Sequence, residues 1–268
     1  MPRAVILHGH MFKNAGTTLD WSLRRSFGEG FVDHRDDDAM RNNGEYLATY
    51  LREHSSVTAL SSHWLPLPVP ETPDIKPRVL LLFRHPLERS RSVYKFERAQ
   101  LDANAAGNKN ARALSFRDYV KWRLQPGTGP AIKNFHTRYC SGNYFGKDMA
   151  QLYDQALHNL ESIPLTGLVH RYGASMVLFE QSLVKVFPDL DLSWKIQNVS
   201  QTSTPSLEDK LADIAEELGD TYSSLIDENK YDMMLFQYIQ KRFEHQLSQI
   251  PKLGSHLTAM ARRNESLT

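Results

Sequence analysis

The chain has 268 residues, and its 32 lysine and arginine side chains nearly balance 31 acidic ones, giving a formal net charge of +1. Apolar residues make up 41% and charged residues 24%, which is typical of a globular protein. The chain lacks the basic excess of general nucleic-acid-binding proteins, so we expect no nucleic-acid partner. Its single cysteine, Cys140, excludes an internal disulfide framework and a multi-cysteine metal site.

The sequence also bears on membrane insertion and location. No apolar run reaches the roughly 20 residues that a membrane-spanning helix needs, so we expect no integral membrane segment. The apolar stretch Ala4–Leu7 is shorter than the roughly 7–15-residue core of a signal peptide. One cysteine fits a reducing compartment. We therefore expect a cytoplasmic protein, with a trimmed leader as the alternative; the sequence does not predict the oligomeric state.

Apolar patterns predict alternating strands and helices. Buried strands are expected at Ala4–Leu7, Val57–Leu60, Val79–Phe83 and Leu165–Val169. Continuous apolar runs of this kind suit a parallel sheet that is covered on both faces. Helical spacing of apolar residues predicts helices at Thr17–Phe27, Leu87–Leu101, Met149–Leu160, Ala174–Phe187, Leu207–Leu218 and Tyr231–Phe243. This alternation indicates an α/β fold, with helices accumulating toward the C-terminus.

Proline and polar clusters predict the loops. Leu65–Pro77 contains five prolines and is expected to be loop throughout, because proline neither donates to a strand ladder nor continues a helix. Gly107–Ala111 and Gln125–Pro130 are further predicted loops, and the polar stretch Ala261–Thr268 is expected to fray. We find no internal repeat, low-complexity tract or long linker, so residues 1–268 are expected to form one domain.

The most informative segment follows the first predicted strand, where a polar loop opens an amphipathic helix. The first N–H groups of a helix lack backbone partners, and with the helix dipole they favour phosphate or sulfate. Gly16 would let an oxyanion approach the backbone, and Lys13 would supply a charge. A threonine-capped helix start with an incidental lysine is the alternative. The residues concerned are Lys13, Asn14, Ala15, Gly16, Thr17 and Thr18.

A second cluster follows the strand Val79–Phe83. Arg84 stands at its carboxyl end, which is where ligands bind in open α/β sheets. Pro86 predicts a helix start and places Ser92 about two turns into that helix, so Arg84 and Ser92 can converge on a second anion. A solvated basic helix face is the alternative, and it applies above all to Arg89 and Arg91.

Together the two motifs resemble those of the sulfotransferases that use 3′-phosphoadenosine 5′-phosphosulfate (PAPS), in particular the Golgi carbohydrate and heparan sulfate 2-O-sulfotransferases and their bacterial relatives. In that family H-x-P-K-x-G-G-T-T binds the 5′-phosphosulfate, and R-D-P-x-x-R-x-x-S-x-Y binds the 3′-phosphate. The matching stretches are HMFKNAGTT at 10–18 and RHPLERSRSVY at 84–94. Phe12 replaces the family proline, Asn14 and Ala15 replace threonine and glycine, and His85 replaces aspartate.

The resemblance implies a P-loop-like three-layer α/β/α fold with a central parallel sheet and extra C-terminal helices. It implies PAPS as co-substrate, adenosine 3′,5′-bisphosphate as product, and a carbohydrate or other small-molecule hydroxyl as acceptor. The two motifs are the specific part of the resemblance, and they imply a donor site formed by Lys13–Thr18, Arg84 and Ser92. Within this family, bacterial relatives favour a cytoplasmic location, and a trimmed Golgi-lumenal domain is the alternative.

Sulfonate transfer needs a base for the acceptor hydroxyl, and we predict that His63 is this base. It follows the strand Val57–Leu60 at the sheet edge that carries both motifs. It resembles the histidine of a family glycine-histidine pair, with Ser62 in place of glycine. A histidine pKa of about 6.5 suits this role. A loop histidine packed beside Trp64 is the alternative. Lys13 and the helix N-terminus would stabilise the leaving group, so we expect no metal ion.

Other polar residues are weaker candidates. The segment 10–18, which includes Lys13–Thr18, is called the anion loop below. His10 lies in it and is expected near the site, beside His8. His136 and Arg138 belong to a segment similar to a family helix that ends in a glycine, and they line the acceptor side or form a buried polar face. We expect His170 to be structural.

Two further sequence patterns are not assigned to a binding site. The run 36–38 of three aspartates is expected to be a solvated loop rather than a metal site. Asn198 and Asn264 match the glycosylation acceptor pattern, which has meaning only in a secreted protein.

Two alternative functions remain. A metal-dependent nucleotide or small-molecule kinase is disfavoured, because the ATP-type P-loop places its lysine after two glycines. A non-catalytic scaffold that keeps the nucleotide pocket is disfavoured by the retained lysine, arginine and histidine.

Overall fold

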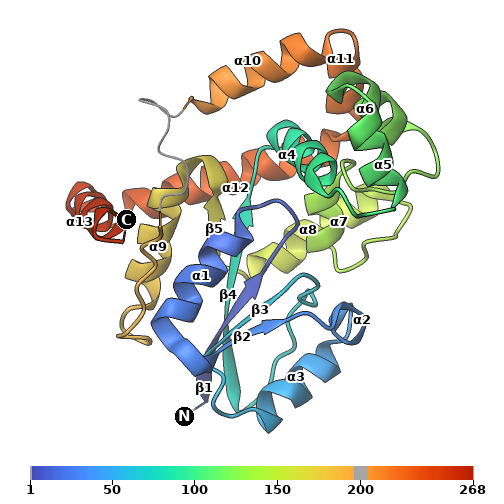
Figure 1. Cartoon of the computed structure of the whole chain (residues 1–268). Helices are drawn as coiled ribbons and strands as arrows, with labels where there is room; N and C mark the ends of the chain where they lie inside the picture. Colours follow the sequence, from blue (N-terminus) through green and yellow to red (C-terminus); the bar gives the residue numbers. More distant parts are fainter. Residues whose placement is uncertain (1, 196–204, 268) are drawn as a thin grey trace.

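The computed structural model describes residues 2–195 and 205–267, so the glycosylation motif at Asn198 lies outside the described residues. A five-stranded parallel sheet forms the centre of the molecule, with the strand order β2-β3-β1-β4-β5 (Figure 1). The strands are β1 (Arg3–Gly9), β2 (Phe31–His34), β3 (Ala59–Ser62), β4 (Ile75–Phe83) and β5 (Leu165–Leu168).

Helices fill the connections and follow the last strand. Those before β5 are α1 (Gly16–Phe27), α2 (Asp37–Met40), α3 (Gly44–Glu53), α4 (Pro86–Ala99), α5 (Ala106–Ala113), α6 (Phe116–Leu124), α7 (Phe135–Cys140) and α8 (Met149–Glu161). Those after β5 are α9 (Tyr172–Leu183), α10 (Leu207–Leu218), α11 (Thr221–Glu228), α12 (Lys230–Ser248) and α13 (Leu253–Glu265). Two short 3₁₀ helices are η1 (Gly28–Gly30) and η2 (Val169–Arg171).

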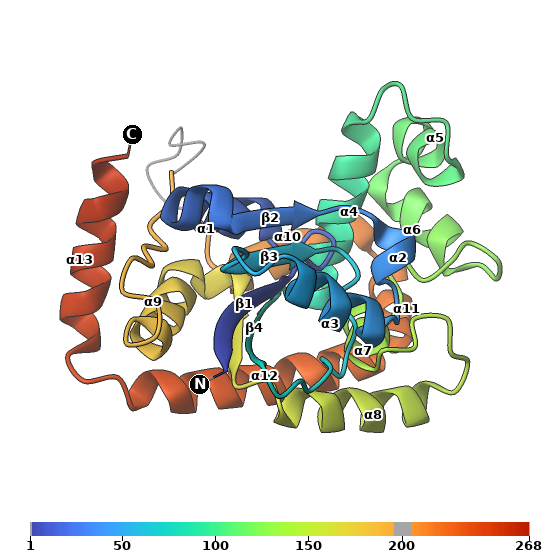
Figure 2. The same ribbon diagram turned by 90° about the horizontal axis from the view of Figure 1, so that it is seen from below.

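Helices cover both faces of the sheet, which gives the predicted three-layer α/β/α fold with extra C-terminal helices. In Figure 2, α1 lies on one side of the sheet, while α8 and α12 run along the other. α9 packs against β5, and α13 packs against α9. In the described part of the chain, no helix is both long enough and apolar enough to cross a membrane.

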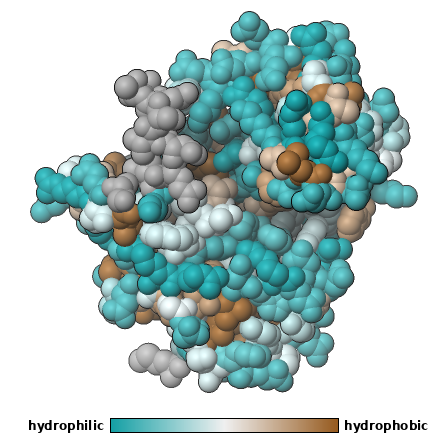
Figure 3. All heavy atoms as spheres, in the orientation of Figure 1, coloured by the Kyte–Doolittle hydropathy of each residue, from teal (hydrophilic) through white to brown (hydrophobic). Residues whose placement is uncertain are grey.

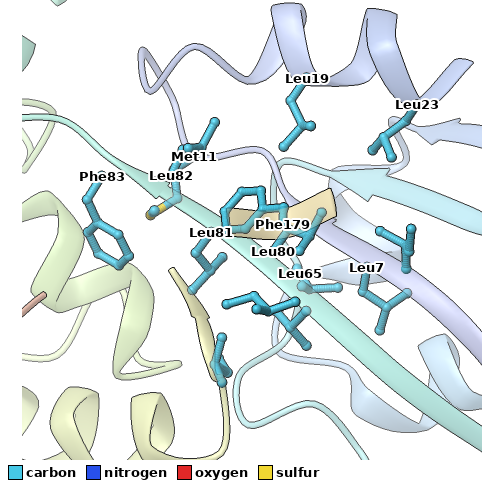
Figure 4. Close-up of a cluster of buried hydrophobic side chains, with 14 of the residues drawn as sticks. Leu7, Met11, Leu19, Leu23, Leu65, Leu80, Leu81, Leu82, Phe83 and Phe179 are labelled. Carbon is cyan, nitrogen blue, oxygen red and sulfur yellow. The ribbon is translucent and has the colours of Figure 1, made fainter. Parts of the chain in front are cut away.

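The core lies on both faces of β1 and β4. Val5, Ile6 and Leu7 of β1 are fully buried, because a parallel strand between two helical layers exposes neither face. Leu19 and Leu23 of α1 point toward the sheet from one side, as Figure 4 shows. A second buried cluster lies under α4, α6, α10 and α11. On the face seen in Figure 3, hydrophilic residues dominate and apolar ones form separate small areas.

Several sequence predictions are wrong in detail. The loop predicted for Leu65–Pro77 ends early, because β4 begins at Ile75 and Pro77 pairs with Val5. β5 pairs with β4 only from Leu80 onward, so this part of β4 has a strand on one side only, where proline is tolerated. β2 was not predicted, since Phe31–His34 is a short edge strand without an apolar run.

Two helices also replace predicted irregular structure. The stretch predicted as a loop at Gly107–Ala111 belongs to α5, and Ala111 and Gly107 are buried against neighbouring helices. The C-terminal stretch expected to fray continues α13 to Glu265. Its Met260 and Asn264 are buried, and the Asn264 side chain accepts a hydrogen bond from the backbone N–H of Trp194 at 2.9 Å.

Candidate functional site

The carboxyl ends of β1, β3 and β4 meet at one edge of the sheet. Gly9 pairs with Ser62 on one side and with Leu81 on the other. The segments that follow these strands line a cleft of about 720 Å³. The cleft brings together eight predicted site residues: His10, Lys13, Ala15, Gly16, Thr17, Thr18, His63 and Arg84. Its lining also includes Phe12, Asp20, Trp21, Arg24, Asp33, Arg35 and Phe96.

The loop between β1 and α1 has an unusual backbone. Lys13 and Ala15 adopt left-handed conformations, with φ of 63° and 61°. Such conformations cost about 1–2 kcal/mol for a residue other than glycine, and they cluster at functional sites. No described side chain caps the N-terminus of α1, so the alternative of a threonine cap is wrong. The N–H of Thr18 donates to the Ala15 carbonyl at 3.2 Å, which leaves those of Gly16 and Thr17 available to an anion in the cleft.

Gly16 also leaves room for His10. A Cβ atom at this position would lie 2.2 Å from Cδ2 of His10. The imidazole of His10 thus rests directly on the helix start. Any side chain at position 16 would displace His10 from the cleft.

Two cations, Lys13 of this loop and Arg84 after β4, line the cleft. Burial lowers the pKa of Lys13, and the neighbouring charge of Arg84 lowers it further. Burial also lowers the pKa of Arg84, although Glu88 opposes the shift. Nε of Arg84 has no hydrogen-bond partner among the described residues. Two partly desolvated cations that repel each other favour an anion between them.

A hydrogen-bonded network fixes His10. Asp20 of α1 accepts from Nδ1 of His8 and of His10, both at 2.7 Å. Arg35 donates to the same Asp20 carboxylate at 3.0 Å. Burial raises the pKa of Asp20, but the two histidines outweigh burial and lower it below the ordinary carboxyl value. Burial lowers the pKa of His10, so its ring is neutral near pH 7.

The same network has the composition of a metal site. His8, His10 and Asp20 each place one potential ligand atom within 4.8 Å of the others. However, the guanidinium of Arg35 pairs with the Asp20 carboxylate from the cleft side, and it also pairs with Asp33. A positive group in that position opposes a second cation, so we assign the cluster to orienting His10.

His63 stands at the boundary between the cleft and a second pocket. Its ring meets that of His10 edge to face, with centroids 5.0 Å apart. Nδ1 of His63 lies 3.5 Å from the Asp37 carboxylate. Burial lowers the pKa of His63 and repulsion by Arg35 adds to this, while Asp37 partly opposes it. The second pocket, of about 250 Å³, includes Phe12 and His63 in its lining, as the cleft does.

A third hollow adjoins the cleft on the side of α1. It has a volume of about 410 Å³ and shares Ala15, Thr17, Thr18 and Trp21 with the cleft. Its remaining lining comes from Val169, Tyr172, Trp194 and Lys195. Aromatic side chains from α1, α9 and the segment after α9 thus surround a space that opens next to the anion loop.

Some predicted site residues lie elsewhere. Ser92 of α4 is not among the residues that line the cleft. His136 is fully buried, and its Nε2 pairs with Asn14 Oδ1 at 3.0 Å, so it does not reach an acceptor. Arg138 donates to the carbonyls of Tyr144 and Gly146, which holds that loop. His170 is also absent from the cleft lining.

Comparison with known proteins gives one informative match. No family model matches the chain. A protein of Archaeoglobus fulgidus is 31% identical over 245 residues, which cover 89% of this chain and 97% of the archaeal protein. The chain belongs to the family of that archaeal protein. Its name, "Uncharacterized protein", states no activity, so the chemistry of this family must be argued from the site.

Several residues of the cleft were not predicted from the sequence. Arg35 follows β2, and it was overlooked because the strand itself was not predicted. Asp20 could not be recognised as a site residue from the sequence, because a single acidic residue is ordinary in an amphipathic helix. The aspartate run does not form the expected loop: Asp36 caps α2, Asp37 faces His63, and Asp38 is exposed. Arg89, interpreted as a solvated residue, is buried.

Asn14 holds the loop rather than lining the cleft. Its side-chain oxygen accepts from the backbone N–H of Arg84 at 2.8 Å and faces Nε2 of His136. We expect Asn14→Ala to lower the free energy of unfolding by about 2–3 kcal/mol, because buried donors lose their acceptor. Urea denaturation measures this change. Asn104→Ala, at an exposed position before α5, serves as a control, and equal stability of both variants would contradict the linking role of Asn14.

Proposed function

We propose that the protein transfers a sulfonate group from PAPS to the hydroxyl of an acceptor. One observation carries the proposal: a cleft with an uncapped helix N-terminus and the cations Lys13 and Arg84, neither of which forms an ion pair with a described residue, meets a second pocket at a histidine, His63. Such a junction suits an anionic donor on one side and a neutral acceptor on the other. The resemblance of the two sequence motifs to sulfotransferases points to the same chemistry.

The donor would lie along the cleft. The N–H groups at the start of α1, with Thr17, Thr18 and Lys13, would bind the 5′-phosphosulfate. Arg84 would bind the 3′-phosphate. The hollow lined by Trp21, Tyr172 and Trp194 offers flat aromatic surfaces to the adenine ring. These assignments leave Ser92, which lies outside the cleft lining, without a role in binding.

The chemical step is an in-line displacement at sulfur. The acceptor oxygen forms a bond to sulfur while the bond between sulfur and the phosphate oxygen breaks. Nε2 of His63 takes the acceptor proton, because Nδ1 faces Asp37. Lys13 and the α1 N–H groups stabilise the charge that develops on the leaving adenosine 3′,5′-bisphosphate.

Binding of the product nucleotide tests the donor site. We expect Arg84→Ala to weaken the affinity for adenosine 3′,5′-bisphosphate about 10- to 100-fold, since a charge-assisted hydrogen bond is worth about 1.5–3 kcal/mol. Isothermal titration calorimetry without added metal measures this loss. Arg52→Ala on the exposed face of α3 is the matched control.

Two results would contradict the donor assignment. One is an Arg84→Ala affinity equal to that of the unmodified protein. The other is thermal stabilisation by ATP with Mg²⁺ and none by adenosine 3′,5′-bisphosphate, which would favour a kinase instead.

A further inference from the structure

The pocket on the far side of His63 is built from aromatic side chains. Phe12, Trp64, Phe135, Tyr139 and Tyr144 line it, together with Ala131. Its other lining residues are Asp37 and His63. These side chains come from the loop after β1, the loop after β3, α7 and the segment after α7. The pocket is therefore assembled from the same strand ends as the cleft.

The aromatic walls support one another. Trp64 and Tyr144 meet edge to face with centroids 4.9 Å apart, and Phe135 and Tyr144 do so at 5.8 Å. Such pairs are worth about 0.5–1.5 kcal/mol beyond their buried area. The guanidinium of Arg41 lies over the Trp64 ring at 4.2 Å. The walls are thus ordered before any ligand enters.

A buried arginine supports the wall of the pocket that includes Phe135. Arg89 of α4 lies 3.9 Å from the centroid of the Phe135 ring. It also donates to the backbone carbonyls of Phe12 and Ala131. One side chain therefore contacts three residues that line the pocket. A fully buried arginine is costly unless its donors are paired, and here that pairing fixes the shape of the pocket.

The polarity of the pocket limits what it can bind. A sugar ring carries several hydroxyl groups, and each needs a hydrogen-bond partner when it leaves water. The charged or titrating groups of the lining near neutral pH are limited to Asp37 and His63. The Asp37 carboxylate also repels an acidic acceptor. The other polar groups of the lining residues are the hydroxyls of Tyr139 and Tyr144 and the indole N–H of Trp64, and the Tyr139 hydroxyl is buried beside Gly9. Flat aromatic walls with these few polar groups favour a planar, uncharged ring over a sugar or an anionic oligosaccharide.

The size of the pocket narrows the choice further. Its volume of about 250 Å³ lies below the roughly 300–1,000 Å³ of pockets for drug-sized ligands. One ring or two fused rings therefore fill it. A hydroxyl on the ring edge that faces the cleft would lie beside His63, which the two cavities share.

We propose that this pocket is the acceptor site and that the acceptor is an uncharged aromatic alcohol of one or two rings. The proposal rests on the proposed sulfonate transfer, because it assigns the acceptor of that reaction. The transfer then joins the sulfonate to the aromatic hydroxyl oxygen, and the hydroxyl proton goes to His63.

The probe for this site is 2-naphthol, with methyl β-N-acetylglucosaminide as the sugar counterpart. Calorimetry on the full chain measures the affinity of each, with and without adenosine 3′,5′-bisphosphate. Transfer of ³⁵S from labelled PAPS to each compound measures the reaction. We expect binding of 2-naphthol and ³⁵S transfer to it, and neither for the sugar.

Two matched variants separate the pocket from the fold. Tyr144→Leu removes an aromatic wall, and we expect it to weaken 2-naphthol about 3- to 10-fold, a range that corresponds to one aromatic pair. Its affinity for adenosine 3′,5′-bisphosphate should stay unchanged. Tyr153→Leu makes the same change on α8, where the Tyr153 ring pairs with Tyr231 and lines neither the pocket nor the cleft, and it should change neither affinity.

The outcomes distinguish the acceptor class from the reaction. Transfer to the sugar and none to 2-naphthol would overturn the aromatic acceptor and leave sulfonate transfer intact. Equal affinity of 2-naphthol for the unmodified protein and for Tyr144→Leu would overturn the pocket assignment. Failure of adenosine 3′,5′-bisphosphate to bind would overturn the proposed function, and the acceptor role of the pocket with it.

Discussion

Replacement of His63 by alanine is expected to lower the turnover number about 100- to 10,000-fold, the usual contribution of a general base. The affinity for adenosine 3′,5′-bisphosphate should remain the same, because the proposed donor site consists of Lys13, Arg84 and the start of α1. Turnover is measured by ³⁵S transfer and affinity by calorimetry. His158→Ala, at a surface position of α8 that is 76% exposed, is the control and should leave both unchanged.

The pH profile gives this prediction a second readout. The pKa of His63 is lowered, first by burial and then by Arg35, so the neutral base is present at and above pH 6.5. Activity should fall on the acid side below that pH, as His63 takes up a proton. Asp37 favours the protonated ring, so Asp37→Asn should lower this pKa further and move the acid limb to lower pH.

A purely structural role for His63 would not produce these effects. In that case His63→Ala would lose stability and leave the pH profile of the remaining activity in place. Full turnover in His63→Ala would assign the base elsewhere, and His10 is the next candidate because Asp20 holds its Nδ1 and its ring rests on Gly16.

The sequence predicted the parts of the fold that depend on local pattern. β1 and β4 have apolar residues on both faces, and α10 has a clear helical period with a capping serine, so the structure confirms the predicted bounds of α10. β2 has no such pattern, because only the first and last of its four residues are buried. Pro77 could be placed in a strand only when its neighbours were known.

The site residues also differ in whether local sequence pattern was enough to predict them. Lys13, Thr17 and Thr18 are recognisable from the sequence because they lie within one loop and helix start. The burial of Asn14 and Arg89 depends on α7 and on the segment before it, which are far away in the chain. His136 gave an ambiguous signal for this reason: a polar residue on a short helix faces either a cleft or a buried partner, and here that partner is Asn14.

Asp232→Ala is expected to destabilise the fold more strongly than Asn14→Ala does. The Asp232 carboxylate of α12 is fully buried and accepts from the backbone N–H groups of His136 and Thr137 at 2.9 and 2.8 Å. Nδ1 of His136 lies 3.4 Å away. Removal of the carboxylate leaves these buried donors unpaired, which should cost about 3–5 kcal/mol of unfolding free energy. Urea denaturation measures the loss.

Asp38→Ala is the control, because this α2 side chain is 97% exposed and its loss should change stability by less than about 0.5 kcal/mol. The pH dependence supplies an independent test. Burial raises the pKa of Asp232, but His136 and the two N–H groups outweigh burial and lower it. The unmodified protein should therefore hold this stability above the ordinary carboxyl pKa and lose it as the pH falls through the lowered value.

The consequence for the site follows from a chain of contacts that runs from α12 through α7 to Asn14 of the loop between β1 and α1. Asp232 holds the start of α7, His136 of α7 faces Asn14, and Asn14 binds the backbone of Arg84. We therefore expect the Asp232→Ala variant, when kept folded by adenosine 3′,5′-bisphosphate, to bind this nucleotide more weakly than the unmodified protein does. An unfolding free energy within about 1 kcal/mol of the unmodified value would show that α12 does not hold this part of the site.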